Sequence, residues 1–167
     1  TREAIVAFQA DFPDLSVNVV DNTLRTIPSG VNRAIEASRG SIIVRLDAHS
    51  KPYPDYVENC VRALEEGQGD NVGGVWEIQP GADTWIAKSI AVAAAHPLGV
   101  GDALYRHARY AAEVDTVPFG SFKRELISRI GFFDESLLTN EDYEFNARIR
   151  KAGGRIWLDP SIRSVYF

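Results

Sequence analysis

A run of apolar and β-branched residues that ends in two metal-ligand side chains is the strongest constraint in this sequence. Residues 41–46 read Ser-Ile-Ile-Val-Arg-Leu, and Asp47-Ala48-His49 follows directly. β-Branched runs favour strands, and in open α/β sheets ligands bind beyond the carboxyl ends of the strands. The pattern therefore predicts a strand over 41–46 that delivers Asp47 and His49 to a crevice.

Two interpretations of Asp47 and His49 stay open at this level. If the backbone remains extended, both side chains leave one face, and a carboxylate with an imidazole suits Mn²⁺ better than Mg²⁺, which prefers oxygen ligands. Substrate phosphates and water would then complete the coordination shell. The alternative is an ordinary turn, because Asp, His and the Ser-Lys-Pro that follows are common where a strand ends.

A second acidic pair, Glu141-Asp142, opens a predicted helix. Carboxylates in a first turn are favoured by the helix dipole, and the preceding Asn140 is a good N-capping residue, which is one explanation for the pair. However, Asp142 lies at helical spacing from Phe145 and Ile149 and so shares their apolar face. That placement favours the other explanation, a base at the edge of a cleft.

The rest of the pattern alternates between helices and strands. We expect helices over 1–12, 30–38, 54–66, 84–95, 123–130 and 139–152, and strands over 17–20, 41–46, 72–78, 117–119, 155–158 and 164–167. Residues 98–116 contain no convincing strand. The order predicts a mixed α/β sheet flanked by helices, in one domain that covers residues 1–167.

The composition is that of an ordinary folded domain, with 45% hydrophobic residues, 25% charged residues and a net charge of −5. Without a basic cluster, nucleic acid is not expected as a partner. The single cysteine, Cys60, follows a helical apolar pattern and is predicted to be a buried thiol. No apolar stretch reaches the ~20 residues that span a bilayer, and no signal peptide is recognised, so we expect a cytoplasmic location.

Other residues carry weaker signals. Gly120 either lets a ligand approach the backbone closely or permits a turn. The three tryptophans, Trp76, Trp85 and Trp157, are expected to be in the core or half-buried. The sequence enters in the middle of a helical pattern and contains no methionine, so we expect it to be a piece of a longer protein.

Together these segments resemble the family 2 nucleotide-sugar glycosyltransferases with the GT-A fold, in particular their succinoglycan-type exopolysaccharide branch. Four blocks carry the resemblance: Pro28-Ser29-Gly30-Val31-Asn32-Arg33-Ala34-Ile35; residues 43–50; Val117-Pro118-Phe119-Gly120-Ser121-Phe122 with Gly131-Phe132-Phe133-Asp134-Glu135; and Asn140-Glu141-Asp142-Tyr143-Glu144-Phe145. They extend over nearly the whole chain in the family's order.

The resemblance assigns roles to the matched residues. Asp47 and His49 occupy the family's D-x-D positions, with His in place of the usual second Asp, and would bind a divalent metal, Mn²⁺ or Mg²⁺. Asp142 matches the catalytic base of an inverting transfer, with Glu141 beside it near the acceptor. Asn32, Gly120, Glu141 and Asp47 are assigned to substrate binding.

The resemblance also implies substrates and surroundings. The expected donor is a nucleotide sugar, and the expected acceptor is a saccharide or a lipid-linked saccharide. The family's first strand, helix and second strand, which hold the nucleotide base, are missing, which leaves open whether this piece alone is active. Exposed strand edges would favour self-association, and the parent protein would act at the cytoplasmic face of a membrane.

Two other functional classes remain as alternatives. A non-catalytic pseudo-glycosyltransferase would keep the fold and the binding role without turnover, which the His at position 49 favours and the retained Asp47 and Asp142 disfavour. A nucleotidyltransferase on a related fold would need a glycine-rich, basic nucleotide loop near the start of the chain. The sequence contains no such loop.

Overall fold

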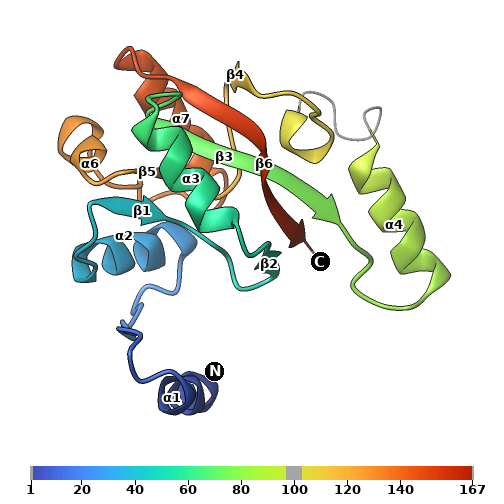
Figure 1. The fold of residues 1–167 in the computed structure, drawn as a ribbon, viewed down its shortest axis with the longest axis horizontal. Helices are drawn as coiled ribbons and strands as arrows, with labels where there is room; N and C mark the ends of the chain where they lie inside the picture. The colour runs from blue at the N-terminus through green and yellow to red at the C-terminus, as the bar shows by residue number, and fades with distance from the viewer. Residues whose placement is uncertain (1, 97–102, 167) are drawn as a thin grey trace.

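A six-stranded mixed sheet organises the computed structural model, which describes residues 2–96 and 103–166 (Figure 1). Its strands are β1 (Ile42–Val44), β2 (Ser50–Pro52), β3 (Asn71–Ile78), β4 (Ala112–Val114), β5 (Ser121–Lys123) and β6 (Ile156–Tyr166). Their order is β1-β5-β3-β6-β2, and β4 also pairs with β6. Only β3 and β6 run parallel among these pairs. The predicted mixed α/β sheet is therefore confirmed.

Helices cover both faces of the sheet, and Figure 1 shows α3 in front of it and α7 behind. The helices are α1 (Arg2–Asp11), α2 (Ile27–Ala37), α3 (Tyr56–Glu65), α4 (Trp85–Ala95), α6 (Glu125–Ile130) and α7 (Glu141–Lys151), with a short 3₁₀ turn, η1, at Leu104–Arg106. No helix in the described part of the chain combines the length and the apolar character that crossing a membrane requires.

Two apolar clusters form the core. On one side α3 buries Tyr56, Cys60 and Leu64 at helical spacing against β3 and β6, which confirms the prediction of a buried free thiol. Burial raises the pKa of Cys60 to about 11, so this thiol has little nucleophilic character. On the other side α2, α6 and α7 pack around stacked Phe133 and Phe145.

The structure corrects several predicted strands. Residues 17–20 form no strand, because this mostly exposed segment has no partner strand. The strand predicted at 117–119 lies instead at β5, and β4 forms within the segment predicted to be irregular, whose residues 98–102 fall outside the described residues. β2 was not predicted. β6 is continuous from Ile156 to Tyr166, because the irregular register opposite Gly73 and Val75 accommodates Pro160.

Two predictions about helices also change. α2 begins at Ile27, three residues before the predicted start, because Pro28 is well suited to the first turn. Trp85 is 77% exposed, so its predicted burial is wrong, whereas Trp76 and Trp157 are half-buried as expected. α4 buries only Ala91, and its large apolar side chains, Trp85, Ile86, Ile90 and Val92, are exposed.

The contact between β3 and β6 leaves no room for a side chain at Gly74. A Cβ added there would lie 1.7 Å from the carbonyl oxygen of Ile162, whereas one added at Gly81 would meet nothing within 4 Å. We expect Gly74→Ala to lower the free energy of unfolding by about 3 kcal/mol or more, and Gly81→Ala to change it by less than ~0.5 kcal/mol. Urea denaturation measures the free energy of unfolding of both variants. Equal effects of the two substitutions would contradict the close contact of β3 with β6 at Gly74.

Candidate functional site

The segment after β1 forms the turn that carries the predicted metal ligands. The N–H of Ser50 donates to the carbonyl of Asp47 at 3.1 Å, and the Ser50 hydroxyl donates to the same oxygen at 2.8 Å. The backbone is therefore turned rather than extended, as the alternative interpretation expected. Asp47 is half-buried and His49 is exposed.

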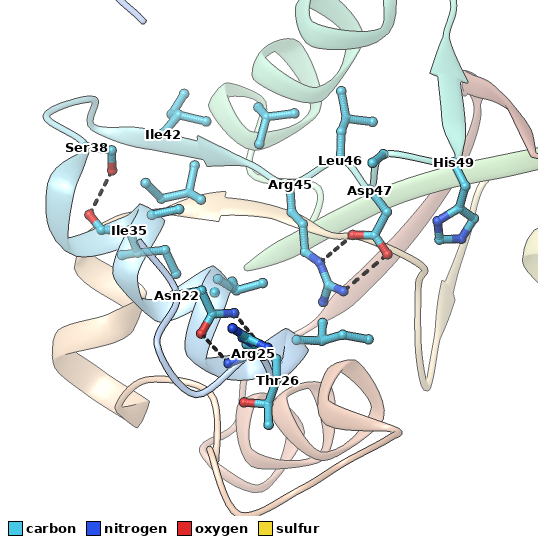
Figure 2. A pocket seen from close by; sticks show the side chains of 17 residues that line it. Asn22, Arg25, Thr26, Ile35, Ser38, Ile42, Arg45, Leu46, Asp47 and His49 are labelled. Atoms are coloured by element: carbon cyan, nitrogen blue, oxygen red, sulfur yellow. Dashed lines mark hydrogen bonds and ion pairs between the residues drawn. The ribbon is translucent and has the colours of Figure 1, made fainter. Parts of the chain in front are cut away.

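A cavity of about 810 Å³ begins at this turn. Figure 2 shows its lining, which comes from the loop before α2, one side of α2, β1 and the turn itself. The wall along α2 and β1 is apolar, with Val31, Ile35 and Ile42, whereas Arg25 and Asp47 bring opposite charges to the lining. A cavity with an apolar wall and a few polar groups is typical of small-molecule sites. Asp47 and His49 thus share one cavity despite the turn.

Arg45 links Asp47 to the acidic pair on α7. Its Nε lies 3.2 Å from Oδ1 of Asp47, and its Nη2 lies 2.8 Å from Oε1 of Glu141. Figure 2 shows the guanidinium turned toward the Asp47 carboxylate. Burial lowers the pKa of Arg45, but Asp47 and Glu141 raise it by more. The arginine therefore stays charged and neutralises two carboxylates that would otherwise repel each other.

His49 is oriented by the last described residue of β6. Its Nε2 lies 2.8 Å from the hydroxyl of Tyr166, which in turn stacks on Trp76 with a ring separation of 4.0 Å. In the tautomer whose Nε2–H donates to Tyr166, Nδ1 carries the lone pair that a cation needs.

The residues present fit a substrate-completed metal site. Within residues 2–96 and 103–166, no three His, Cys, Asp or Glu side chains gather into a full ligand set. Asp47 and His49 could supply two ligands, with the rest coming from substrate and water. Both Asp47 oxygens receive hydrogen bonds from Arg45, Oδ1 from Nε at 3.2 Å and Oδ2 from Nη2 at 3.5 Å.

Asp142 occupies the first turn of α7 beside this ion pair. Burial and the neighbouring Glu141 raise the pKa of Asp142, against the opposing effects of the Tyr143 N–H and Arg45. The buried face of α7 carries Glu141, Phe145 and Ile149, whereas Asp142 is half-buried. The capping prediction is wrong: Asn140 is left-handed, with φ 60°, and its side chain caps nothing. Asp142 is not among the residues that line the cavity of Figure 2.

Strained backbone surrounds these groups. The non-glycine residues with positive φ in the described ranges are Arg25, Phe119 and Asn140, at 57°, 63° and 60°. Arg25 lines the cavity, and Asn140 precedes Glu141. Phe119 contacts Trp76 with ring centroids 5.2 Å apart. Such conformations cost ~1–3 kcal/mol each and cluster at functional sites.

Gly120 and Asn32, both assigned to substrate binding, make contacts within the protein. A Cβ on Gly120 would lie 2.7 Å from the amide oxygen of Asn71, and its φ of +74° favours the turn explanation. Asn32 donates to the carbonyl of Phe133 and to Glu135, each at 2.9 Å, and accepts from the Phe133 N–H. These bonds join α2 to the segment before α7.

The structure brings Asp47, His49, Glu141 and Asp142 into one region through two residues that sequence reasoning missed. Arg45 carried a detectable signal, because a charged residue inside a strand-like apolar run is costly to bury unless it is paired. Tyr166 carried no such signal in the sequence, because its contact with His49 joins residues that are 117 positions apart.

The chain matches the family model described as glycosyl transferase family 2 over residues 1–131. It therefore belongs to glycosyl transferase family 2. It is 31% identical over 169 residues to the succinoglycan biosynthesis protein ExoA of Rhizobium meliloti (strain 1021), a match that covers all of this chain and 50% of the relative. A match of 25% identity covers 53% of a dolichyl N-acetyl-α-D-glucosaminyl phosphate 3-β-D-2,3-diacetamido-2,3-dideoxy-β-D-glucuronosyltransferase of Methanococcus voltae and all of this chain. The chain thus spans about half the length of these relatives.

Solved structures share the fold. The mannosyltransferase PcManGT of Pyrobaculum calidifontis, in complex with GDP-Man and Mn²⁺, superposes with a TM-score of 0.70 at 24% identity, over 99% of this chain and 43% of that one. TarS of S. aureus in complex with UDP-GlcNAc gives 0.67 at 14% identity, over 98% of this chain and 45% of that one. These matches confirm the predicted GT-A-type sheet.

The raised pKa of Asp142 predicts its effect on stability. A carboxyl whose pKa is higher folded than unfolded costs stability once the pH exceeds its unfolded pKa, so Asp142→Asn should raise the melting temperature at pH 7 by about 1–3 °C. The pKa of Asp70 is lowered, because hydrogen bonds and the ion pair to Arg129 outweigh the opposing effect of burial. Asp70→Asn should therefore lower the melting temperature at pH 7. Calorimetric melting of Asp142→Asn and Asp70→Asn checks the sign of each change in melting temperature. A lower melting temperature for Asp142→Asn would contradict the partly buried position of Asp142 beside Glu141.

Proposed function

We propose that the protein is a metal-dependent, inverting glycosyltransferase that moves one sugar from a nucleoside diphosphate donor to a saccharide or lipid-linked saccharide during polysaccharide biosynthesis. The observation that carries the proposal is the ion-pair bridge of Arg45 between Asp47 and Glu141. It places the strand-end turn next to the acidic first turn of α7, in a chain of glycosyl transferase family 2. Both groups are needed for sugar transfer, one beside the donor phosphates and the other beside the acceptor.

The relatives support the proposed substrates. The structural neighbours are bound to GDP-Man with Mn²⁺ and to UDP-GlcNAc. The Methanococcus relative is named for transfer to a dolichyl-linked sugar phosphate, and the Rhizobium relative for succinoglycan biosynthesis. We propose the same classes of donor and acceptor here, and a cytoplasmic site of action at a membrane face for the complete protein.

In the proposed reaction each side chain has a separate task. Asp47 and His49 would hold the divalent metal, which would supply positive charge to offset that of the departing diphosphate. The end of the cavity at Asp47 and His49 would receive the diphosphate of the donor. Asp142 would accept the proton of the acceptor hydroxyl as its oxygen bonds to the anomeric carbon and the bond from that carbon to the diphosphate oxygen breaks. Attack opposite the leaving group inverts the anomeric centre.

Metal-dependent nucleotide binding tests the donor half of the proposal. Titration calorimetry with UDP and GDP should show binding that requires Mn²⁺ and weakens at least about tenfold in Asp47→Ala. The control is Asp83→Ala, which removes a carboxylate that is 91% exposed and lies outside the cavity lining. Binding without transfer by the complete protein would favour the pseudo-glycosyltransferase alternative. Equal binding by Asp47→Ala would refute the metal site.

The pH dependence of transfer tests Asp142 as the base. The base must be ionised, so kcat should rise with pH through the Asp142 pKa, and its acid limb should lie above the range of an ordinary aspartate. Asp142→Asn should lower kcat by about 10²–10⁴-fold. Glu141→Gln removes one cause of the raised pKa and should move the limb to lower pH. An acid limb that is identical in Glu141→Gln would contradict the assignment.

A further inference from the structure

The Arg45 guanidinium is held from three directions. Its side chain and that of Glu141 are each 7% exposed, and that of Asp47 is 26% exposed. The backbone N–H of Arg45 donates to the carbonyl of Gly120 at 3.2 Å, which fixes the start of the side chain. The guanidinium also lies 5.9 Å from the ring centroid of Phe133. A forked group held in this way can orient the carboxylates it contacts.

The first turn of α7 depends on side-chain contacts for its position, because its own cap does not hold it. Asn140 is left-handed and makes no capping hydrogen bond. Long-range contacts of the turn include Glu141 with Arg45 and the hydroxyl of Tyr143 with Asp115, each at 2.8 Å. Asp115 is exposed, and exposed contacts contribute little, so the buried contact to Arg45 is the stronger restraint.

We infer that Arg45 is a positioning residue that fixes the first turn of α7, and with it Asp142, relative to the turn that carries Asp47. Arg45 acts through Glu141 and Asp47. Its effect on sugar transfer rests on the proposed function. A lysine could neutralise the carboxylates but is a point charge without a planar fork, so it could not hold both in one fixed geometry. The competing explanation is that Arg45 only neutralises the buried Glu141.

Four variants separate the two explanations. Arg45→Gln removes the bridge, and Arg45→Lys keeps only the charge. The double variant Arg45→Gln/Glu141→Gln also removes the buried carboxylate, so it should melt close to the wild type even where Arg45→Gln folds poorly. Arg129→Gln is the matched control, because it breaks an ion pair with the same 2.8 Å contact, to Asp70, outside the site.

Hydrogen exchange gives a readout that does not depend on catalysis. In the complete protein the amides of residues 144–146 should exchange about tenfold faster in Arg45→Gln, and equally fast in the double variant despite its recovered melting temperature. They should be unchanged in Arg129→Gln. Wild-type exchange in the double variant would show that Arg45 only neutralises Glu141, and would overturn the inference.

Kinetics adds the catalytic consequence and keeps the two proposals distinct. In both Arg45→Gln and the double variant, kcat should fall by about 10–100-fold. The KM for the donor should rise by a smaller factor. In Arg45→Lys, kcat should recover in part. A wild-type protein that shows the exchange result but no transfer would refute the proposed function and leave the positioning role intact. Normal transfer together with wild-type exchange in Arg45→Gln would refute the positioning role alone.

Discussion

The parallel pairing of β3 with β6 is the contact on which the rest of the structure depends. β6 pairs with β3 along most of its length, with β4 at its start and with β2 at its end. Both core clusters include residues of β6, Ile156 in one and Ile162 in the other. Gly74 allows the two backbones to approach because it has no side chain. The same pairing carries Tyr166 to Trp76 and His49, so the centre of the fold also determines one end of the candidate site.

Electrostatics shapes the other end of that site. Three carboxylates, from Asp47, Glu141 and Asp142, lie close to a single buried arginine. Removing such charges from water costs several kcal/mol each, and close pairing offsets this only in part. Asp142 therefore keeps a raised pKa, which is unfavourable for folding and suitable for a group that must take up a proton. The strained backbone at Phe119 and Asn140 indicates that this region is held in place by its surroundings rather than by local preference.

Several parts of the fold and site were predictable because they follow from local chemistry. The apolar face of α3, the turn at Asp47 and the acidic start of α7 each arise within a short segment whose periodicity or turn residues specify it. The strand at 17–20 was predicted wrongly because β propensity alone does not form a strand without a partner. The capping role of Asn140 failed for a similar reason, since the contact of Glu141 with Arg45 positions the turn instead.

The sequence by itself determined where the helices and strands β1 and β3 form, the apolar face of α3, and membership of a glycosyl transferase family through the order of its motifs. Only the tertiary structure decided which chemical groups meet. Arg45 and Glu141 are 96 positions apart, and His49 and Tyr166 are 117 apart, so no local pattern encodes either contact. The physical reason is that helices and turns arise from neighbours in sequence, whereas ion pairs and stacked rings depend on how the sheet brings distant strands together.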